Sequence, residues 1–237
     1  ALGLVVMVYQ IEKEWSPAIA AATELLNLTT SKQKPGLHMQ VSHFHCELAE
    51  AALNQHLYEQ ARDELKKAGR QYKNNIRVYI LGARVEFLQG NFQEAVTHLQ
   101  KALQIDATFF SEIFSELEAY TLHADMTERF QAVMELNHEL FSDSSYLKEM
   151  ALYREKNEGA AVALGFLLEK LKQNPSLHLL QQAMQMAFRN HTMENTVLHN
   201  GTEVLALFFS NSPNYRCENC GFELKNLHWA CPGCNRW

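Results

Sequence analysis

Four cysteines near the end of the chain have the residue type and the spacing of a metal site. They form two Cys-x-x-Cys pairs, Cys217 with Cys220 and Cys231 with Cys234. A thiolate is a soft ligand, and four of them suit a tetrahedral zinc or iron ion. Gly221 follows the first pair, where such a loop often needs a positive φ angle, and Pro232-Gly233 favours a turn in the second pair. The pattern predicts one metal ion held by four sulfurs, with zinc preferred and iron as the alternative.

Three functions are compatible with such a site: electron transfer through iron, nucleic-acid binding by a zinc finger, and a structural role. The paired loops resemble a rubredoxin, but the segment between them is short for an electron carrier and no flavin or dinucleotide fingerprint accompanies them. The net charge of −6 disfavours binding to phosphate backbones. A structural metal that folds a segment too small for its own core is therefore favoured. Phe222, Trp229 and Trp237 are expected to form a small core or to pack this segment onto the rest of the chain.

The remaining residues offer no catalytic constellation. The sequence contains neither a phosphate-cradling Gly-Lys loop nor a Gly-x-Ser-x-Gly motif. His138-Glu139 lacks a second histidine at helical spacing, as a zinc-protease helix would require. Cys46 lies alone in an apolar stretch and is predicted to be a small buried hydrophobic residue rather than a reactive thiol. We therefore expect a protein that is not an enzyme.

A repeat of 34 residues organises the chain before the cysteines. Tyr58 and Phe92, Ala61 and Ala95, Leu65 and Leu99, and Ala68 and Ala102 are each 34 residues apart. Small residues allow two helix axes to approach, and the leucines fill the space between them. With only 10 glycines and 5 prolines, the composition also favours long helices over a turn-rich sandwich. The sequence therefore predicts pairs of packed helices.

Weaker matches extend this repeat in both directions. A unit at 110–143 keeps Ile113, Leu117, Tyr120, Val133 and Leu136 in phase but has Arg129 where a small residue is expected. A unit at 144–177 places Ala163, Leu167 and Pro175 in the expected roles, and another helix pair fits 178–210. Upstream, Trp15 and Ala18 match Tyr58 and Ala61, with extra residues at 29–36. We predict a helical array over 1–212 and a metal-binding domain over 213–237.

The 34-residue period resembles the tetratricopeptide repeat. The resemblance implies an all-α superhelical solenoid with a small C-terminal rubredoxin-like zinc ribbon, and a groove lined by the first helices that holds a peptide or protein. The groove-facing positions of that family, transferred to this sequence, include His43, Glu50, Asn54, Arg77, Arg84 and Phe87. Arg77 and Arg84, two helical turns apart beside Phe87, suggest a site for an acidic, partly apolar segment. An ordinary solvated helix face is the alternative.

Such repeats followed directly by "YRCENCGFELKNLHWACPGC" resemble the lipopolysaccharide assembly protein B (LapB/YciM) family. "HFHCELAEAAL" and "GARVEFLQGNFQEAV" carry the resemblance as well. It implies an adaptor on the cytoplasmic side of the inner membrane that presents the deacetylase LpxC to the protease FtsH and answers to a YejM/PbgA-type sensor. It also implies an N-terminal membrane helix and first repeats that precede this chain. A tetratricopeptide adaptor with another client is the main alternative, and the oligomeric state stays open.

Overall fold

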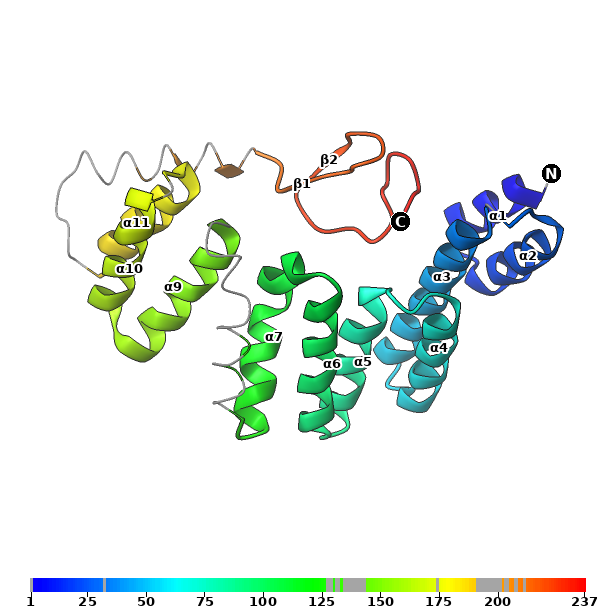
Figure 1. Ribbon diagram of the computed structural model, residues 1–237, viewed down its shortest axis with the longest axis horizontal. Helices are drawn as coiled ribbons and strands as arrows, with labels where there is room; N and C mark the ends of the chain where they lie inside the picture. Colours follow the sequence, from blue (N-terminus) through cyan, green and yellow to red (C-terminus); the bar gives the residue numbers. More distant parts are fainter. Residues whose placement is uncertain are drawn as a thin grey trace. The chain divides into compact units, whose positions relative to one another are not determined.

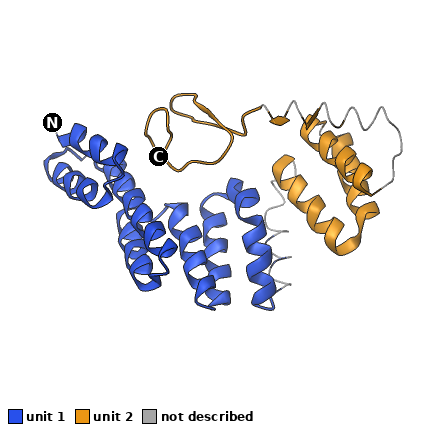
Figure 2. Cartoon of the chain, turned by 180° about the vertical axis from the view of Figure 1, so that it is seen from behind, with its two compact units in different colours: residues 1–134, 237 blue, residues 135–236 orange. Residues whose placement is uncertain are grey.

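The computed structural model describes residues 2–31, 33–126, 130, 133, 144–173, 175–190, 202, 205–206, 209–210 and 212–237 (Figure 1). The chain divides into two compact units, residues 1–134 together with Trp237, and residues 135–236 (Figure 2). Within the part of the chain that is described, no helix combines the length and the apolar character needed to cross a membrane.

The first unit is built from helices that pack in pairs along the chain. They are α1 (Leu2–Ile11), α2 (Trp15–Leu28), α3 (Lys34–Asn54), α4 (Tyr58–Gln71), α5 (Ile76–Leu88), α6 (Phe92–Ile105) and α7 (Phe110–His123), with the short 3-10 helix η1 (Ala107–Phe109) before α7. Helix α1 packs on α2, α3 on α4, and α5 on α6. Each pair also contacts the next one, through α2 with α3, α4 with α5, and α6 with α7 (Figure 1).

The 34-residue repeat appears in the turns as well as in the helices. His56 and Gly90, which end the first helices of two consecutive pairs, both have positive φ. The amide after each bonds a carbonyl five residues earlier, Leu57 to Ala52 and Asn91 to Glu86, both at 2.9 Å. This is the Schellman geometry, which satisfies a carbonyl at a helix end. Glycine adopts it without strain, whereas His56 must be held in it by the flanking helices.

The small and large residues predicted for the interior of the repeats are buried. Ala61, Ala68, Ala95 and Ala102 are completely inaccessible, as is Leu99, and Leu65 is nearly so. Alanines at these positions let α4 approach α3, and α6 approach α5, closely enough for Leu65 and Leu99 to fill the remaining space. Cys46 is also inaccessible within this core, as predicted for a small hydrophobic residue.

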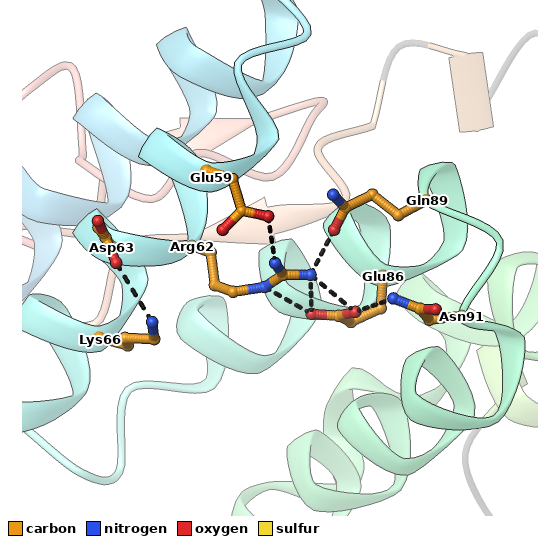
Figure 3. A network of polar contacts seen from close by, with 7 residues as sticks. All are labelled: Glu59, Arg62, Asp63, Lys66, Glu86, Gln89 and Asn91. Atoms are coloured by element: carbon orange, nitrogen blue, oxygen red, sulfur yellow. Dashed lines mark hydrogen bonds and ion pairs between the residues drawn. The ribbon is translucent and has the colours of Figure 1, made fainter.

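Polar contacts join one helix pair to the next at the edge of this core. Arg62 of α4 donates to Glu86 of α5 through Nε at 3.0 Å and Nη2 at 2.9 Å, and it also contacts Glu59 and Gln89 (Figure 3). Asn91 donates to the same Glu86 at 2.8 Å. A two-pronged arginine–carboxylate contact fixes orientation as well as distance. The network therefore sets how consecutive repeats meet.

The repeat shifts by one residue at the third turn. Asp125 has positive φ and lies 35 residues after Gly90, and the amide of Met126 bonds the carbonyl of Thr121 in the same geometry. Ala61 and Ala95 are buried five residues after the turn residues His56 and Gly90. Phe130 is buried at the equivalent position, five residues after Asp125. Ile113, Leu117, Tyr120 and Val133 are buried. Arg129, Leu136 and the pair His138-Glu139 lie outside the described residues.

The second unit contains three described helices and a small two-stranded sheet. The helices are α9 (Ser144–Glu158), α10 (Ala160–Gln173) and α11 (Leu177–Arg189), which all contact one another. Ala163 and Leu167 are completely buried, and Pro175 lies between α10 and α11, as the repeat predicts. Most of the helix expected after α11 falls outside the described residues. Strands β1 (Tyr215–Arg216) and β2 (Glu223–Leu224) pair antiparallel, with Tyr215 opposite Leu224. The predicted fold class, tetratricopeptide-type helix pairs followed by a rubredoxin-like ribbon, is confirmed.

Candidate functional site

The four predicted metal ligands come together in the ribbon. The sulfurs of Cys217, Cys220, Cys231 and Cys234 all lie within 4.8 Å of one another. Cys217 Sγ is 3.8 Å from Cys234 Sγ, and Cys220 Sγ is 3.7 Å from Cys231 Sγ. A zinc–sulfur bond of about 2.3 Å places the corners of a tetrahedron about 3.8 Å apart. The sulfurs are too distant for disulfides, and their spacing fits one tetrahedral ion.

Two loops of the same design present these sulfurs. In the first, Gly221 N–H donates to the carbonyl of Cys217 and Cys217 N–H to that of Phe222, both at 2.8 Å. In the second, Asn235 N–H donates to Cys231 at 2.7 Å and Cys231 N–H to Arg236 at 2.8 Å. The residue with positive φ is Gly221 in the first loop, as predicted, and Asn235 in the second. Asparagine tolerates this conformation better than most residues because its short polar side chain can bond locally.

Gly233 has a second role besides the turn that Pro232-Gly233 predicts. It lies in the turn of the second loop, but its φ is not positive. A Cβ atom at this position would lie 2.8 Å from the ring of Phe222. Gly233 therefore allows Phe222 to cross the loop at close range. Phe222 remains 45% exposed, and Trp229 is half-buried.

The loops prepare two of the sulfurs for deprotonation. Backbone N–H groups of Cys220 and Asn219 lower the pKa of Cys217. The N–H of Arg236, with the side chain of Asn219, lowers the pKa of Cys234 to about 6. The Phe222 N–H also lowers the pKa of Cys220, but desolvation and the three neighbouring sulfurs outweigh it and raise that pKa to about 12. Four crowded thiols cannot all lose their protons alone, so a divalent cation is the natural counter-charge.

An outer layer of side chains supports Cys234. Asn219 Nδ2 donates to Cys234 Sγ at 3.5 Å, and Arg236 donates to Asn219 Oδ1 at 2.6 Å. Such contacts orient a ligand and tune its basicity. With four protein ligands, a tetrahedral ion has no coordination position left for a substrate. Such a ligand set is typical of a structural or electron-transfer site rather than of a hydrolytic one.

Trp237, the last residue, is packed within the first unit. Its ring stacks on His43 with centroids 4.6 Å apart and planes at 9°, and it meets Phe44 at 6.0 Å and Trp15 at 6.3 Å, both edge-on. The guanidinium carbon of Arg77 lies 5.9 Å from the ring centroid. We call the residues Trp15, His43, Phe44 and Arg77 the Trp237 seat. It draws on α2, α3 and α5.

His43 is kept neutral in this seat. Only 8% of the residue is exposed. Desolvation, with a smaller contribution from the positive charge of Arg77, lowers its pKa from 6.5 to about 4. Its Nδ1 and the Nε1 of Trp237 are buried, and neither finds a hydrogen-bond partner among the residues that the structure describes.

Arg77 is committed to carboxylates of the preceding repeat. It is 2% exposed, and its guanidinium bonds Glu47 at 2.6 Å and also Glu50. Asn75 caps the same helix by accepting from Arg77 N–H at 3.1 Å, and its amide donates to Ser42 at 2.9 Å. The charge of Arg77 is thus already balanced within the chain.

The other groove positions are more separate. Arg84, 40% exposed at its side chain, donates to Glu116 of α7 at 2.8 Å. Phe87 stacks on Tyr120 at 4.1 Å, and Asn54 is exposed at the end of α3. The structure therefore groups His43, Glu50 and Arg77, whereas Arg84 and Phe87 face α7.

Sequence reasoning missed two members of the seat, Trp15 and Phe44, and also Glu47, which bonds Arg77. Trp15 was interpreted only as the start of a second helix. The spacing of Glu47 and Glu50, three residues apart on a first helix and followed by Arg77 in the next one, was the available signal.

Comparisons with known proteins agree with the resemblance. Residues 215–237 match the family described as Rubredoxin metal binding domain. Lipopolysaccharide assembly protein B of Escherichia coli K12 is 26% identical over 241 residues, and that of Haemophilus influenzae Rd is 23% identical over 244. Each alignment covers the whole of this chain, which spans about 60% of the length of these relatives.

Among solved structures, the crystal structure of MamA aligns with 82% of this chain and with 94% of the MamA chain, at a TM-score of 0.41 and 13% sequence identity. This likeness is too distant to add to the fold assignment. The resemblance to lipopolysaccharide assembly protein B is confirmed over the whole chain, with a match to the rubredoxin metal binding domain at its C-terminal end.

Proposed function

We propose that this chain is a non-enzymatic adaptor in lipopolysaccharide assembly. The observation that carries the proposal is the similarity, over the whole of this chain, to proteins named for that process, together with the four-sulfur ribbon near its C-terminal end. We further propose that it binds LpxC and presents it to FtsH on the cytoplasmic side of the inner membrane, under a YejM/PbgA-type sensor. These partners follow from the resemblance alone.

An adaptor of this kind works by raising the local concentration of a substrate at its protease. It needs surfaces for proteins and no reacting group of its own. The first-helix positions supply a candidate surface, with His43, Glu50 and Arg77 in one place and Arg84 and Phe87 in another. Arg84 is the better probe of a client, because its side chain is partly exposed whereas Arg77 is buried in its ion pairs.

The metal ion in this proposal is structural, with zinc as the expected ion. Cys217, Cys220, Cys231 and Cys234 hold it, and it supplies the binding free energy that folds the ribbon. The two strands contain only two residues each, and Cys231 is the one ribbon residue among those described that counts as a buried hydrophobic group. A segment with so little core depends on its metal for folding, by about 10 kcal/mol or more.

The test combines metal analysis with a binding measurement. The purified chain should contain one zinc per molecule, and Cys231→Ser should lose the metal, unfold at lower temperature and no longer retain LpxC in a pull-down. His228→Ala is the matched control, since His228 is an exposed ribbon residue that is not a ligand. A Cys231→Ser variant with full thermal stability and full LpxC binding would refute the structural role.

Two alternatives make different forecasts. A rubredoxin-type electron carrier is favoured by the fact that four thiolates suit iron equally well, and it would be a red protein with a reversible iron couple. A colourless protein with one zinc rules against it. An adaptor for another client would keep its metal but fail to retain LpxC. The client surface can then be located by comparing the binding of LpxC to Arg84→Ala and to Lys101→Ala on α6. If only Arg84→Ala weakens this binding, the client contacts the surface around Arg84.

A further inference from the structure

The seat of Trp237 lies on the helices that the tetratricopeptide resemblance assigns to ligand binding. His43 on α3 and Arg77 on α5 are both groove-facing positions, and the ring of Trp237 stacks on the first at 4.6 Å and lies 5.9 Å from the guanidinium carbon of the second. Trp237 is the last residue of the chain. Trp237 thus occupies these positions in the manner of a side chain of a bound peptide.

The seat is a built site rather than a casual contact. His43 and Arg77 are 8% and 2% exposed, and Phe44 is inaccessible. Trp15 and Phe44 form an apolar floor with ring centroids 5.8 Å apart. An aromatic ring that stacks on a flat imidazole and lies near a guanidinium gains both stacking and cation–π attraction. The matching ligand is therefore an aromatic side chain.

Charges around the seat define the flanking residues of that ligand. Arg77 is bonded to both Glu47 and Glu50, so these three side chains carry one net negative charge. His43 is neutral because its pKa is lowered to about 4. Acidic segments are disfavoured here and basic ones favoured. In this chain the residue before Trp237 is also basic, although the guanidinium of Arg236 bonds Asn219 within the ribbon.

Trp237 fills the seat without satisfying its polar atoms. Nδ1 of His43 and Nε1 of Trp237 are both buried, and within the described part of the chain neither has a hydrogen-bond partner. Buried polar groups left unpaired weaken an interaction. A ligand that pairs with Nδ1 of His43 would bind more tightly than the chain's own tryptophan.

We infer that the Trp237 seat is a binding site for an aromatic residue, next to a basic one, on a partner protein, and that Trp237 occupies it as a built-in competitor. Tail and partner exclude each other, so the seat opens only when the tail leaves. The inference rests on the protein-binding part of the proposed function but not on the identity of the client.

The test uses a peptide of residues 235–237, Asn-Arg-Trp, with the full chain. Because the tethered tail competes at a high local concentration, the peptide should bind Trp237→Ala at least about tenfold more tightly than wild type, as measured by NMR of the peptide. Trp237→Phe should be intermediate. The double variant His43→Ala with Trp237→Ala should lose binding, and the peptide Asn-Arg-Ala should bind none of the proteins.

Equal binding to wild type and Trp237→Ala, or binding to neither, would overturn the inference. Should Trp237→Ala lose its helical circular dichroism, wild type labelled with 5-fluorotryptophan gives an independent answer. Excess Asn-Arg-Phe should then move the fluorine signal of Trp237 to its solvent-exposed position. An unmoved signal contradicts the competition. Failure to retain LpxC, by contrast, affects only the proposed client.

Discussion

Removal of the Trp237 ring should return His43 towards ordinary titration. In the wild type, desolvation and the charge of Arg77 lower the pKa of His43 from 6.5 to about 4. The Trp237 ring stacks on the imidazole with planes at 9°, so it provides one face of that burial. Trp237→Ala opens this face to water while Arg77 stays in place. The pKa of His43 should therefore rise by at least about one unit without reaching 6.5.

The same change has a calculable effect on stability. A histidine with a lowered folded-state pKa contributes fully above its unfolded value of 6.5, and this stability is lost as the pH falls towards about 4. Between pH 7 and pH 5, His43 accounts for a loss of about 2 kcal/mol in the wild type. With a pKa near 5.5 in Trp237→Ala, the corresponding loss falls to about 1 kcal/mol.

NMR titration of the histidine ring signals measures the pKa of His43 directly. His98 is an internal control, because desolvation also lowers its pKa and its ring contacts Tyr79, far from Trp237 in the sequence. The expected result is a higher pKa for His43 alone. If His43 titrates at the same pH in both proteins, the ring does not bury it. If His98 shifts equally, the variant has perturbed the whole unit.

Three further perturbations test the repeats and the ribbon. Arg62→Ala should lower the free energy of unfolding by about 1–2 kcal/mol, because it removes the two-pronged contact with Glu86 (Figure 3). Lys66→Ala should change it by less than about 0.5 kcal/mol, because the Lys66–Asp63 pair is exposed. Urea unfolding compares the two variants, and equal effects would refute the role of the network. Asn75→Ala should cost about 1–3 kcal/mol in the same assay, since it removes a helix cap and leaves Ser42 without its buried donor, and a neutral result would contradict that. Chelation of the metal should abolish amide protection at residues 217–236 in hydrogen exchange, and a ribbon that stays protected without metal would show that the ion is dispensable for its folding.

The helix pairs could be predicted because their cause is local and repeated. Ala61, Ala95, Leu65 and Leu99 recur at a fixed spacing, and each buries itself against a neighbour in sequence. The same holds for the cysteines, whose two-residue spacing brings two sulfurs of one loop to a single ion. Such features depend on a few adjacent residues, so a single sequence displays them.

Other features depend on contacts that spacing does not encode. The turn at Asp125 is displaced by one residue from the 34-residue repeat and uses an aspartate at positive φ, so composition gave no signal of the shift. The sequence placed Arg77 among the candidate groove positions, but its ion pairs with Glu47 and Glu50 of the preceding repeat were not predicted. Trp237 contacts Trp15, more than two hundred positions earlier in the sequence, and only the folded chain brings them together.

LpxC retention by the metal-loaded chain is the most direct test of the central claim that these repeats and this ribbon form an adaptor for lipopolysaccharide assembly. Immobilised wild type and Cys231→Ser should be compared for binding of purified LpxC, with His228→Ala as the control. If the chain is such an adaptor, wild type and His228→Ala should retain LpxC and Cys231→Ser should not. Absence of retention by the wild-type chain with one zinc bound, or undiminished retention by Cys231→Ser, would contradict it.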